Sequence, residues 1–226
     1  MPQKNAWERE YQNPLFITKG DKPQGDVLRF LKFVKKSGTK INDLAILDLG
    51  CGTGRNSNYL ADLGNDVCGL EISPTAIALA KKRAQDLNVS VKYTEQSIGE
   101  KYPFADSTFD LALDVTSSNA LNEKEREIYL QETQRVLKNG GYFFVRALCK
   151  DGDKNAKQLI ANFPGTEKDT YEMPKSGLIE RVFSEQDFRA TYGKFFKILK
   201  LDKKTGYTNF DGQPYKRNYW LAYLKK

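Results

Sequence analysis

One short stretch of the sequence, ILDLGCGTGRN at residues 46–56, places three glycines within five positions directly after an apolar run. Gly50, Gly52 and Gly54 allow the chain to turn sharply and bring backbone N–H groups close to a ligand. An acidic residue, Asp48, precedes the glycines. Because ligands bind beyond the carboxyl ends of strands in open α/β sheets, these residues predict a ligand site directly after a strand.

Two common ligands of glycine-rich loops do not fit this spacing. A dinucleotide loop requires G-x-G-x-x-G, but the sixth position from Gly50 is Arg55. A Walker-type phosphate loop requires Gly-Lys-Ser/Thr, which is also missing. Neither a nicotinamide enzyme nor a nucleotidase is therefore favoured. The sequence instead holds a second acidic residue, Glu71, at the end of the next apolar run.

The elements around this loop are expected to alternate between strands and helices. Ser73-Pro74 is a helix-start signal, and Asn139-Gly140-Gly141 is expected to end a helix. Such alternation predicts an α/β fold with a Rossmann-like, doubly wound and mostly parallel sheet. The expected strands are 44–49, 66–71, 89–94, 109–115 and 142–147, and the expected helices are 26–36, 56–63, 74–87 and 124–137.

The carboxyl-terminal part departs from this rhythm. After a helix at 185–192, strands at 195–207 and 215–224 are joined by a short turn containing Asp-Gly, which predicts an antiparallel hairpin. Residues 148–183 are irregular in pattern and are expected to form an excursion on the substrate side of the sheet. With residues 1–40 as an amino-terminal helical cap, the whole chain is expected to be one domain.

Four motifs occur in the order found in the class I S-adenosylmethionine-dependent methyltransferases, and the chain resembles that family. They are LDLGCGTG at 47–54, the strand-end Glu71, PF-x-D-x-x-FD at 103–110 and RVLKNGGYFFV at 135–145. The resemblance implies a seven-stranded sheet with a carboxyl-terminal hairpin. It also implies S-adenosylmethionine as the methyl donor, S-adenosylhomocysteine as the product, and no metal.

The resemblance further implies which residues hold the cofactor. The glycine loop passes beneath its methionine and ribose portions, Asp48 helps to hold the amino-acid end, and Glu71 accepts hydrogen bonds from the ribose hydroxyls, for which a carboxylate is well suited. Residues 96–98 fall where the family contacts adenine, although this chain lacks the aspartate that members often have there. The predicted cofactor-binding residues are Asp48, Gly50, Cys51, Gly52, Thr53, Gly54, Arg55, Asn56, Glu71, Ile72, Gln96, Ser97, Ile98, Asp114 and Val115.

Methyl transfer from a sulfonium is an in-line displacement in which the protein mainly positions and desolvates the reactants. The chain has no histidine, so any general base must be a carboxylate, a tyrosine or a lysine, and Asp114 is the predicted catalytic residue. The absence of histidine favours an acceptor that needs no strong base. Further candidates on the acceptor side, at the ends of the fourth and fifth strands, are Thr116, Asn119, Arg146 and Cys149.

Several residues have two interpretations. Arg55 and Asn56 could bind the cofactor carboxylate or lie on a helix surface, and Glu71 could only cap the following helix. An aromatic lid over the cofactor, or a packed amino-terminal segment, would account for Trp7, Tyr11 and Phe16. The stretch at 13–16, Asn-Pro-Leu-Phe, differs from the Asn-Pro-Pro-aromatic motif of amino-methylating enzymes and precedes the first strand, so it is set aside.

A narrower resemblance concerns the acceptor. The segments GCGTGRNSNYLADLG, FSEQDFRATY and DGQPYKRNYWLAYLKK are similar to tellurite-resistance methyltransferases and their relatives, which act on small thiol- or chalcogen-type acceptors. This similarity favours a small-molecule acceptor. It leaves residues 148–183, where the acceptor pocket is expected, without a match.

Composition leaves other classes open. The net charge is +7, with nine basic and four acidic residues in 1–40, and nine and two in 194–226. Basic termini could dock an RNA or protein substrate, or only form solvated faces. A non-catalytic cofactor-binding protein is the remaining alternative. The three separated cysteines suggest neither disulfides nor zinc, and the absence of a long apolar run or secretory signal predicts a cytoplasmic protein.

Overall fold

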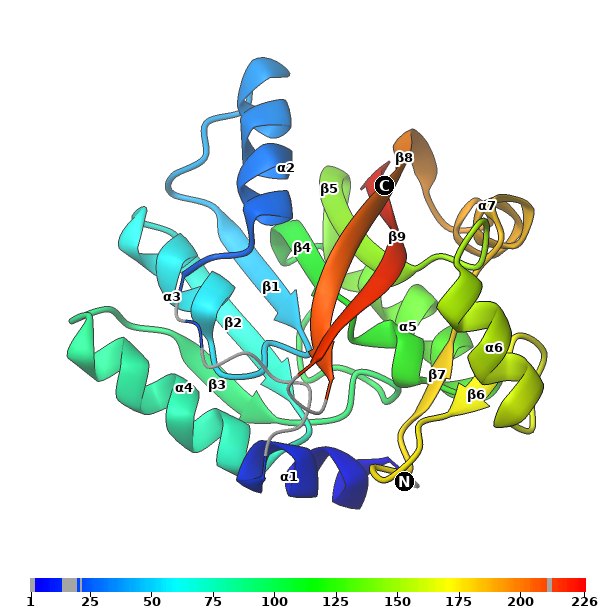
Figure 1. Cartoon of the computed structure of the whole chain (residues 1–226). Coiled ribbons are helices and arrows are strands. Elements are labelled where there is room, and N and C mark those ends of the chain that lie inside the picture. Colours follow the sequence, from blue (N-terminus) through cyan, green and yellow to red (C-terminus); the bar gives the residue numbers. More distant parts are fainter. Residues whose placement is uncertain (1–2, 14–19, 21, 211–212) are drawn as a thin grey trace.

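A seven-stranded sheet organises the molecule (Figure 1). The computed structural model describes residues 3–13, 20, 22–210 and 213–226. The strand order is β3-β2-β1-β4-β5-β9-β8; the first five strands in this order are parallel, and β9 and β8 are antiparallel. This confirms the predicted fold class. The strands are β1 Ala45–Leu49, β2 Asp66–Glu71, β3 Lys92–Glu95, β4 Phe109–Val115, β5 Leu137–Leu148, β8 Lys197–Phe210 and β9 Gln213–Lys225.

Helices cover both faces of the sheet. On one face, Ile46 of β1 packs in a cluster with Phe30 from α2 and Leu60 from α3. On the other face, Leu47 belongs to a cluster that includes Tyr129 of α5. Because both faces are buried, β1 is a continuous apolar run rather than an alternating one. The helices around the main sheet are α2 Gly25–Lys36, α3 Arg55–Asp62, α4 Pro74–Asp86, α5 Glu123–Val136 and α7 Glu185–Tyr192.

Two predicted strand starts are wrong. The helix predicted over 124–137 ends at Val136, but the strand predicted to begin at residue 142 begins at Leu137 and runs through Asn139-Gly140-Gly141. Leu137 pairs with Phe109 of β4, after which the register shifts, so the glycines form an irregularity inside a strand. The third strand begins at Lys92 rather than at residue 89, because the first residues after α4 complete its terminal turn.

The segment expected to be irregular contains regular elements. Between residues 148 and 183, helix α6 Lys154–Asn162 is capped by Asp153, and β6 Thr170–Glu172 pairs with β7 Ile179–Arg181 as a separate two-stranded sheet. At the amino terminus, α1 Lys4–Gln12 lies across the carboxyl-end edge of the parallel strands (Figure 1). In the described part of the chain, no helix has the length and apolarity needed to cross a bilayer.

Candidate cofactor and acceptor site

A cavity of about 690 Å³ lies at the carboxyl ends of β1, β2, β4 and β5. The loops that follow these strands form one part of its wall, and α1, the β6–β7 segment and the β8–β9 hairpin form the rest. This is the edge at which open α/β sheets bind ligands. The predicted cofactor-binding residues line it, except for Gly54 and Asp114.

The glycine loop needs its glycines for both conformation and space. Gly50 and Gly52 have φ angles of 67° and 55°, in the left-handed region. A Cβ atom added to Gly50 would lie 2.3 Å from Ser117 Oγ, and one added to Gly52 would lie 2.7 Å from Tyr11 Oη. Gly54 does not line the cavity. It precedes α3, and a side chain there would collide with Tyr93 and Ala80.

Glu71 ties β2 to the glycine loop. Its carboxylate accepts hydrogen bonds from the backbone N–H groups of Gly52 at 3.0 Å, Ile72 at 2.8 Å and Ser73 at 2.9 Å. The residue is only 5% exposed, and burial raises the pKa of its carboxyl to about 7, although the three donors favour the charged form. The helix-cap interpretation and the ligand interpretation are compatible, since Glu71 also lines the cavity.

Asp48 is the second carboxylate of the cavity. It lies in β1 and accepts a hydrogen bond from Ser57 Oγ of α3 at 2.6 Å. Burial raises the pKa of Asp48 to about 6. Two buried carboxylates with raised pKa values, beside a glycine loop that lines the cavity, suit a ligand that brings a positive charge and hydroxyl donors.

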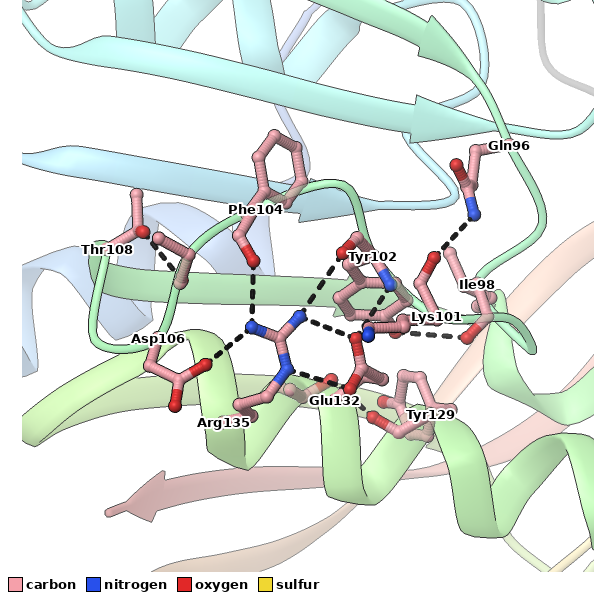
Figure 2. A network of polar contacts seen from close by, with 12 residues as sticks. Gln96, Ile98, Lys101, Tyr102, Phe104, Asp106, Thr108, Tyr129, Glu132 and Arg135 are labelled. Atoms are coloured by element: carbon pink, nitrogen blue, oxygen red, sulfur yellow. Dashed lines mark hydrogen bonds and ion pairs between the residues drawn. The ribbon is translucent and has the colours of Figure 1, made fainter.

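The segment after β3 is clamped against α5 (Figure 2). Arg135 donates hydrogen bonds to the backbone oxygens of Phe104 at 2.8 Å and Tyr102 at 3.2 Å. The Tyr102 hydroxyl donates to the Ile98 oxygen at 3.0 Å, and the Gln96 amide donates to the Lys101 oxygen at 2.9 Å. This network fixes residues 96–98 where they line the cavity.

Helix α1 is anchored at both ends of its span over the cavity. Near α4, the Glu8 carboxylate accepts hydrogen bonds from Ser73 Oγ at 2.6 Å and from the Thr75 backbone N–H at 3.3 Å. At the other end, the Gln3 amide donates to the Ile179 oxygen at 2.6 Å and accepts from the Ile179 N–H at 3.1 Å. The helix therefore joins the cofactor side of the cavity to the β6–β7 segment.

Two of the three aromatic residues predicted for a lid lie on this helix. Trp7 and Tyr11 line the cavity, with ring centroids 6.2 Å apart. Burial raises the pKa of the Tyr11 hydroxyl, with a smaller contribution from the nearby Glu71 carboxylate. Phe16 lies outside the described residues, as does most of the stretch at 13–16. The lid over a bound cofactor remains a prediction.

Asp114 is placed to hold a loop rather than to face a ligand. It is fully buried and does not line the cavity. Its carboxylate accepts hydrogen bonds from the Tyr129 hydroxyl at 2.7 Å and from the backbone N–H groups of Ser117 at 2.8 Å and Ser118 at 3.3 Å. Asp114 therefore orients the loop after β4; burial also raises the pKa of its carboxyl, and its role as a base stays a prediction.

The acceptor-side candidates separate into two groups. Thr116 and Arg146 line the cavity. Asn119 is buried outside the lining, where its side-chain oxygen accepts a hydrogen bond from the Leu148 N–H at 3.1 Å. Cys149 is also fully buried, with its sulfur 3.5 Å from the Asp151 oxygen. Only the first two could touch a ligand in this arrangement.

The rest of the cavity wall comes from residues that were not predicted individually as site residues. Four of them, Pro214, Tyr215, Arg217 and Tyr219, lie in the segment DGQPYKRNYWLAYLKK, whereas 148–183 was predicted only as a region. The amino-terminal segment adds Gln3 and Gln24. The residues of the wall are Leu148, Met173, Leu178, Glu180, Tyr207, Pro214, Tyr215, Arg217 and Tyr219.

The fold, the glycine loop and the two carboxylates agree with comparisons to known proteins. Residues 46–141 match a family model described as a methyltransferase domain. Within the residues that the structure describes, no group of three or more histidine, cysteine or carboxylate side chains could hold a metal ion. Residues 46–141 are therefore a methyltransferase domain, as the resemblance found in the sequence predicted.

Curated relatives share the domain but differ in substrate. The sterol 4-C-methyltransferase strm-1 of Caenorhabditis elegans is 34% identical over 115 residues, which are 50% of this chain and 34% of the relative. The uncharacterized methyltransferase YodH of Bacillus subtilis is 33% identical over 153 residues, which are 67% of this chain and 63% of the relative. The chain thus spans between a third and two thirds of the length of these relatives.

Solved structures show the same architecture. A SAM-dependent methyltransferase of Methanosarcina mazei has a TM-score of 0.73 at 25% identity, covering 85% of this chain and 96% of that chain. TehB of Haemophilus influenzae has a TM-score of 0.66 at 20% identity, covering 99% of this chain and 67% of that chain. At that identity the second likeness shows the fold alone, so the narrower resemblance to tellurite-resistance enzymes remains a prediction.

Proposed function

We propose that the protein transfers a methyl group from S-adenosylmethionine to a small-molecule acceptor by in-line displacement. The observation that carries the proposal is the cavity of about 690 Å³ at the strand ends. It joins the glycine loop and the two buried carboxylates to a wall rich in aromatic, apolar and arginine side chains. Its volume lies in the range of small-molecule sites, about 300 to 1,000 Å³.

The residues present fit this cofactor. Gly50 and Gly52 line the cavity, and the absence of side chains lets their backbone pack against Ser117 and Tyr11 in this conformation. Asp48 supplies a negative charge for an ammonium group, and Glu71 supplies a carboxylate for the ribose hydroxyls. Arg55 and Asn56 line the cavity and are proposed to contact the amino-acid end of the cofactor.

The cofactor, when bound, supplies an electrophilic methyl group and a good leaving group. The protein then has to orient the acceptor and exclude water. Helix α1 and the β8–β9 hairpin line the cavity, so they are placed to orient the acceptor and to exclude water. Since Asp114 is engaged by three donors away from the cavity, we propose an acceptor whose nucleophilic atom ionises without a strong base.

The test is methyl transfer from radiolabelled S-adenosylmethionine into an extract of the cells that produce the protein. The extract is separated into volatile, small soluble, protein and RNA fractions. Label in the volatile or small soluble fraction, lost with an Asp48→Asn variant, supports the proposal. Label in RNA or protein would overturn it in favour of a macromolecular substrate docked on the basic termini.

A further inference from the structure

We propose that Arg146 binds an anionic group of the acceptor, so that the acceptor is a small organic anion with a flat apolar body. This inference rests on the proposed function and specifies its substrate class. Arg146 lies in β5, where it pairs with Val115 of β4 and Leu221 of β9, and its side chain lines the cavity.

The guanidinium of Arg146 is held in position but has its hydrogen-bonding capacity unused. Its central carbon lies 3.5 Å from the centroid of the Tyr219 ring, so the two planar groups are in close contact. The side chain is 14% exposed, and its Nε is 3.4 Å from Asp26 Oδ2 without hydrogen-bond geometry. Among the described residues, none accepts a hydrogen bond from this guanidinium. Of the guanidinium nitrogens, Nε is buried without a hydrogen-bond partner, which is costly unless a ligand satisfies it.

The charge around Arg146 is positive. The buried Asp26 carboxylate is approached by three cations, namely Arg146, Arg29 and Lys204, the last at 2.7 Å. One carboxylate cannot neutralise three cations. Burial first, and the positive charge of Arg146 second, lower the pKa of the cavity-lining Arg55. An anionic group is therefore the ligand that this part of the cavity favours.

The other arginine of the acceptor wall is less suited to an anion. Arg217 forms an ion pair with Asp153 at 3.2 Å and donates a hydrogen bond to the Tyr171 hydroxyl at 2.8 Å. Glu180 accepts a hydrogen bond from the same hydroxyl at 2.7 Å and lines the cavity. Two carboxylates thus surround Arg217, whereas three cations share one carboxylate beside Arg146.

In the sheet, the backbone of Arg146 is set apart from the start of the glycine loop, although its charge acts on Arg55. Leu49 at the end of β1 pairs with Asp114 of β4, and the next residue of β4, Val115, pairs with Arg146 of β5. Arg146 therefore lies two strands away from β1, after which the glycine loop begins. With strands about 4.8 Å apart, this lateral separation is roughly 10 Å. Tyr215, Tyr219 and apolar side chains of the same wall provide surfaces for a flat body beside the anionic group.

The test compares benzoate with its neutral isostere benzamide, each titrated by NMR into the protein saturated with S-adenosylhomocysteine. We expect benzoate to bind about tenfold more tightly than benzamide, as a charge-assisted hydrogen bond allows. Arg146→Gln should remove this preference. The matched control is Lys204→Gln, which removes a cation from the same Asp26 carboxylate but does not line the cavity.

Each outcome decides the inference. Loss of the benzoate preference in Arg146→Gln, with the affinity for S-adenosylhomocysteine unchanged and Lys204→Gln like the wild type, supports it. Equal affinity for both compounds, or no binding of benzoate, overturns it. Loss of S-adenosylhomocysteine binding in Arg146→Gln also overturns it, because Arg146 would then hold the cofactor. Failure of the wild type to bind S-adenosylhomocysteine would instead contradict the proposed function.

Discussion

The stability of the ligand-free protein should decrease as the pH rises from 5 to 8 because of Glu71. Burial raises the pKa of Glu71 from 4.5 to about 7 in the folded state. The contribution of this group to the free energy of unfolding is therefore complete below pH 4.5 and is lost as the pH rises through 7. At 1.36 kcal/mol per pH unit, the loss is about 3 kcal/mol.

The assay is urea denaturation of the ligand-free protein at pH 5 and pH 8, for the wild type and for Glu71→Gln. The glutamine keeps an acceptor oxygen for the Ile72 and Ser73 N–H groups but does not titrate. Asp48 also makes the free energy of unfolding decrease with rising pH, but it is present in both proteins. The difference between the two proteins in how the free energy of unfolding changes with pH therefore reports on Glu71. We expect the variant to lose about 3 kcal/mol less than the wild type between the two pH values.

Parallel pH dependences for the two proteins would refute this reasoning. That result would mean that the three backbone donors keep Glu71 ionised and outweigh its burial. Removing Glu71 should affect the fold as well as cofactor binding, because its carboxylate accepts hydrogen bonds from the backbone of the folded loop. Its alanine variant should weaken cofactor binding by about 1 to 3 kcal/mol and also disturb the glycine loop.

Three further predictions concern single side chains. Gly50→Ala should lower the free energy of unfolding by about 2 kcal/mol or more, measured in urea, because it combines a left-handed backbone with a clash; Gly38→Ala, with φ 89° and open space, is the control for the backbone alone. Calorimetry should show S-adenosylmethionine binding more weakly at pH 5.5 than at pH 8, and Asp48→Asn should bind about tenfold more weakly at pH 8. Asp153→Ala should destabilise the fold by about 3 to 5 kcal/mol in urea, because it removes the ion-pair partner of the buried Arg217 and the cap of α6.

Opposite results would be equally informative. Equal destabilisation by Gly50→Ala and Gly38→Ala would show that the loop can yield around Ser117. An affinity for S-adenosylmethionine that does not change with pH would contradict a titrating carboxylate at the site. A stability of Asp153→Ala within 1 kcal/mol of the wild type would show that water reaches Arg217, so that its charge is not buried in solution.

The sequence by itself determined the sheet and the cofactor half of the cavity. Hydrophobic runs placed β2 and β4 at their observed bounds, because strands buried on both faces leave a continuous apolar signal. The glycine loop, Glu71 and residues 96–98 meet in space because carboxyl ends of neighbouring parallel strands share one edge. Short sequence motifs are enough to predict ligand-contacting residues where these residues lie in short segments at strand ends.

Only the tertiary structure showed the cavity wall beyond the strand ends and the hydrogen-bond partners of Asp114. A carboxylate at a strand end can face a ligand or the loop that follows it, and the sequence looks the same in both cases. In the structure, the backbone N–H groups of Ser117 and Ser118 donate to Asp114, so its carboxylate faces the loop. The acceptor wall brings together residues far apart in the chain, such as Met173 and Tyr219. The close contact of Arg146 with Tyr219 also depends on antiparallel register between β5 and β9, and no local pattern encodes such a register.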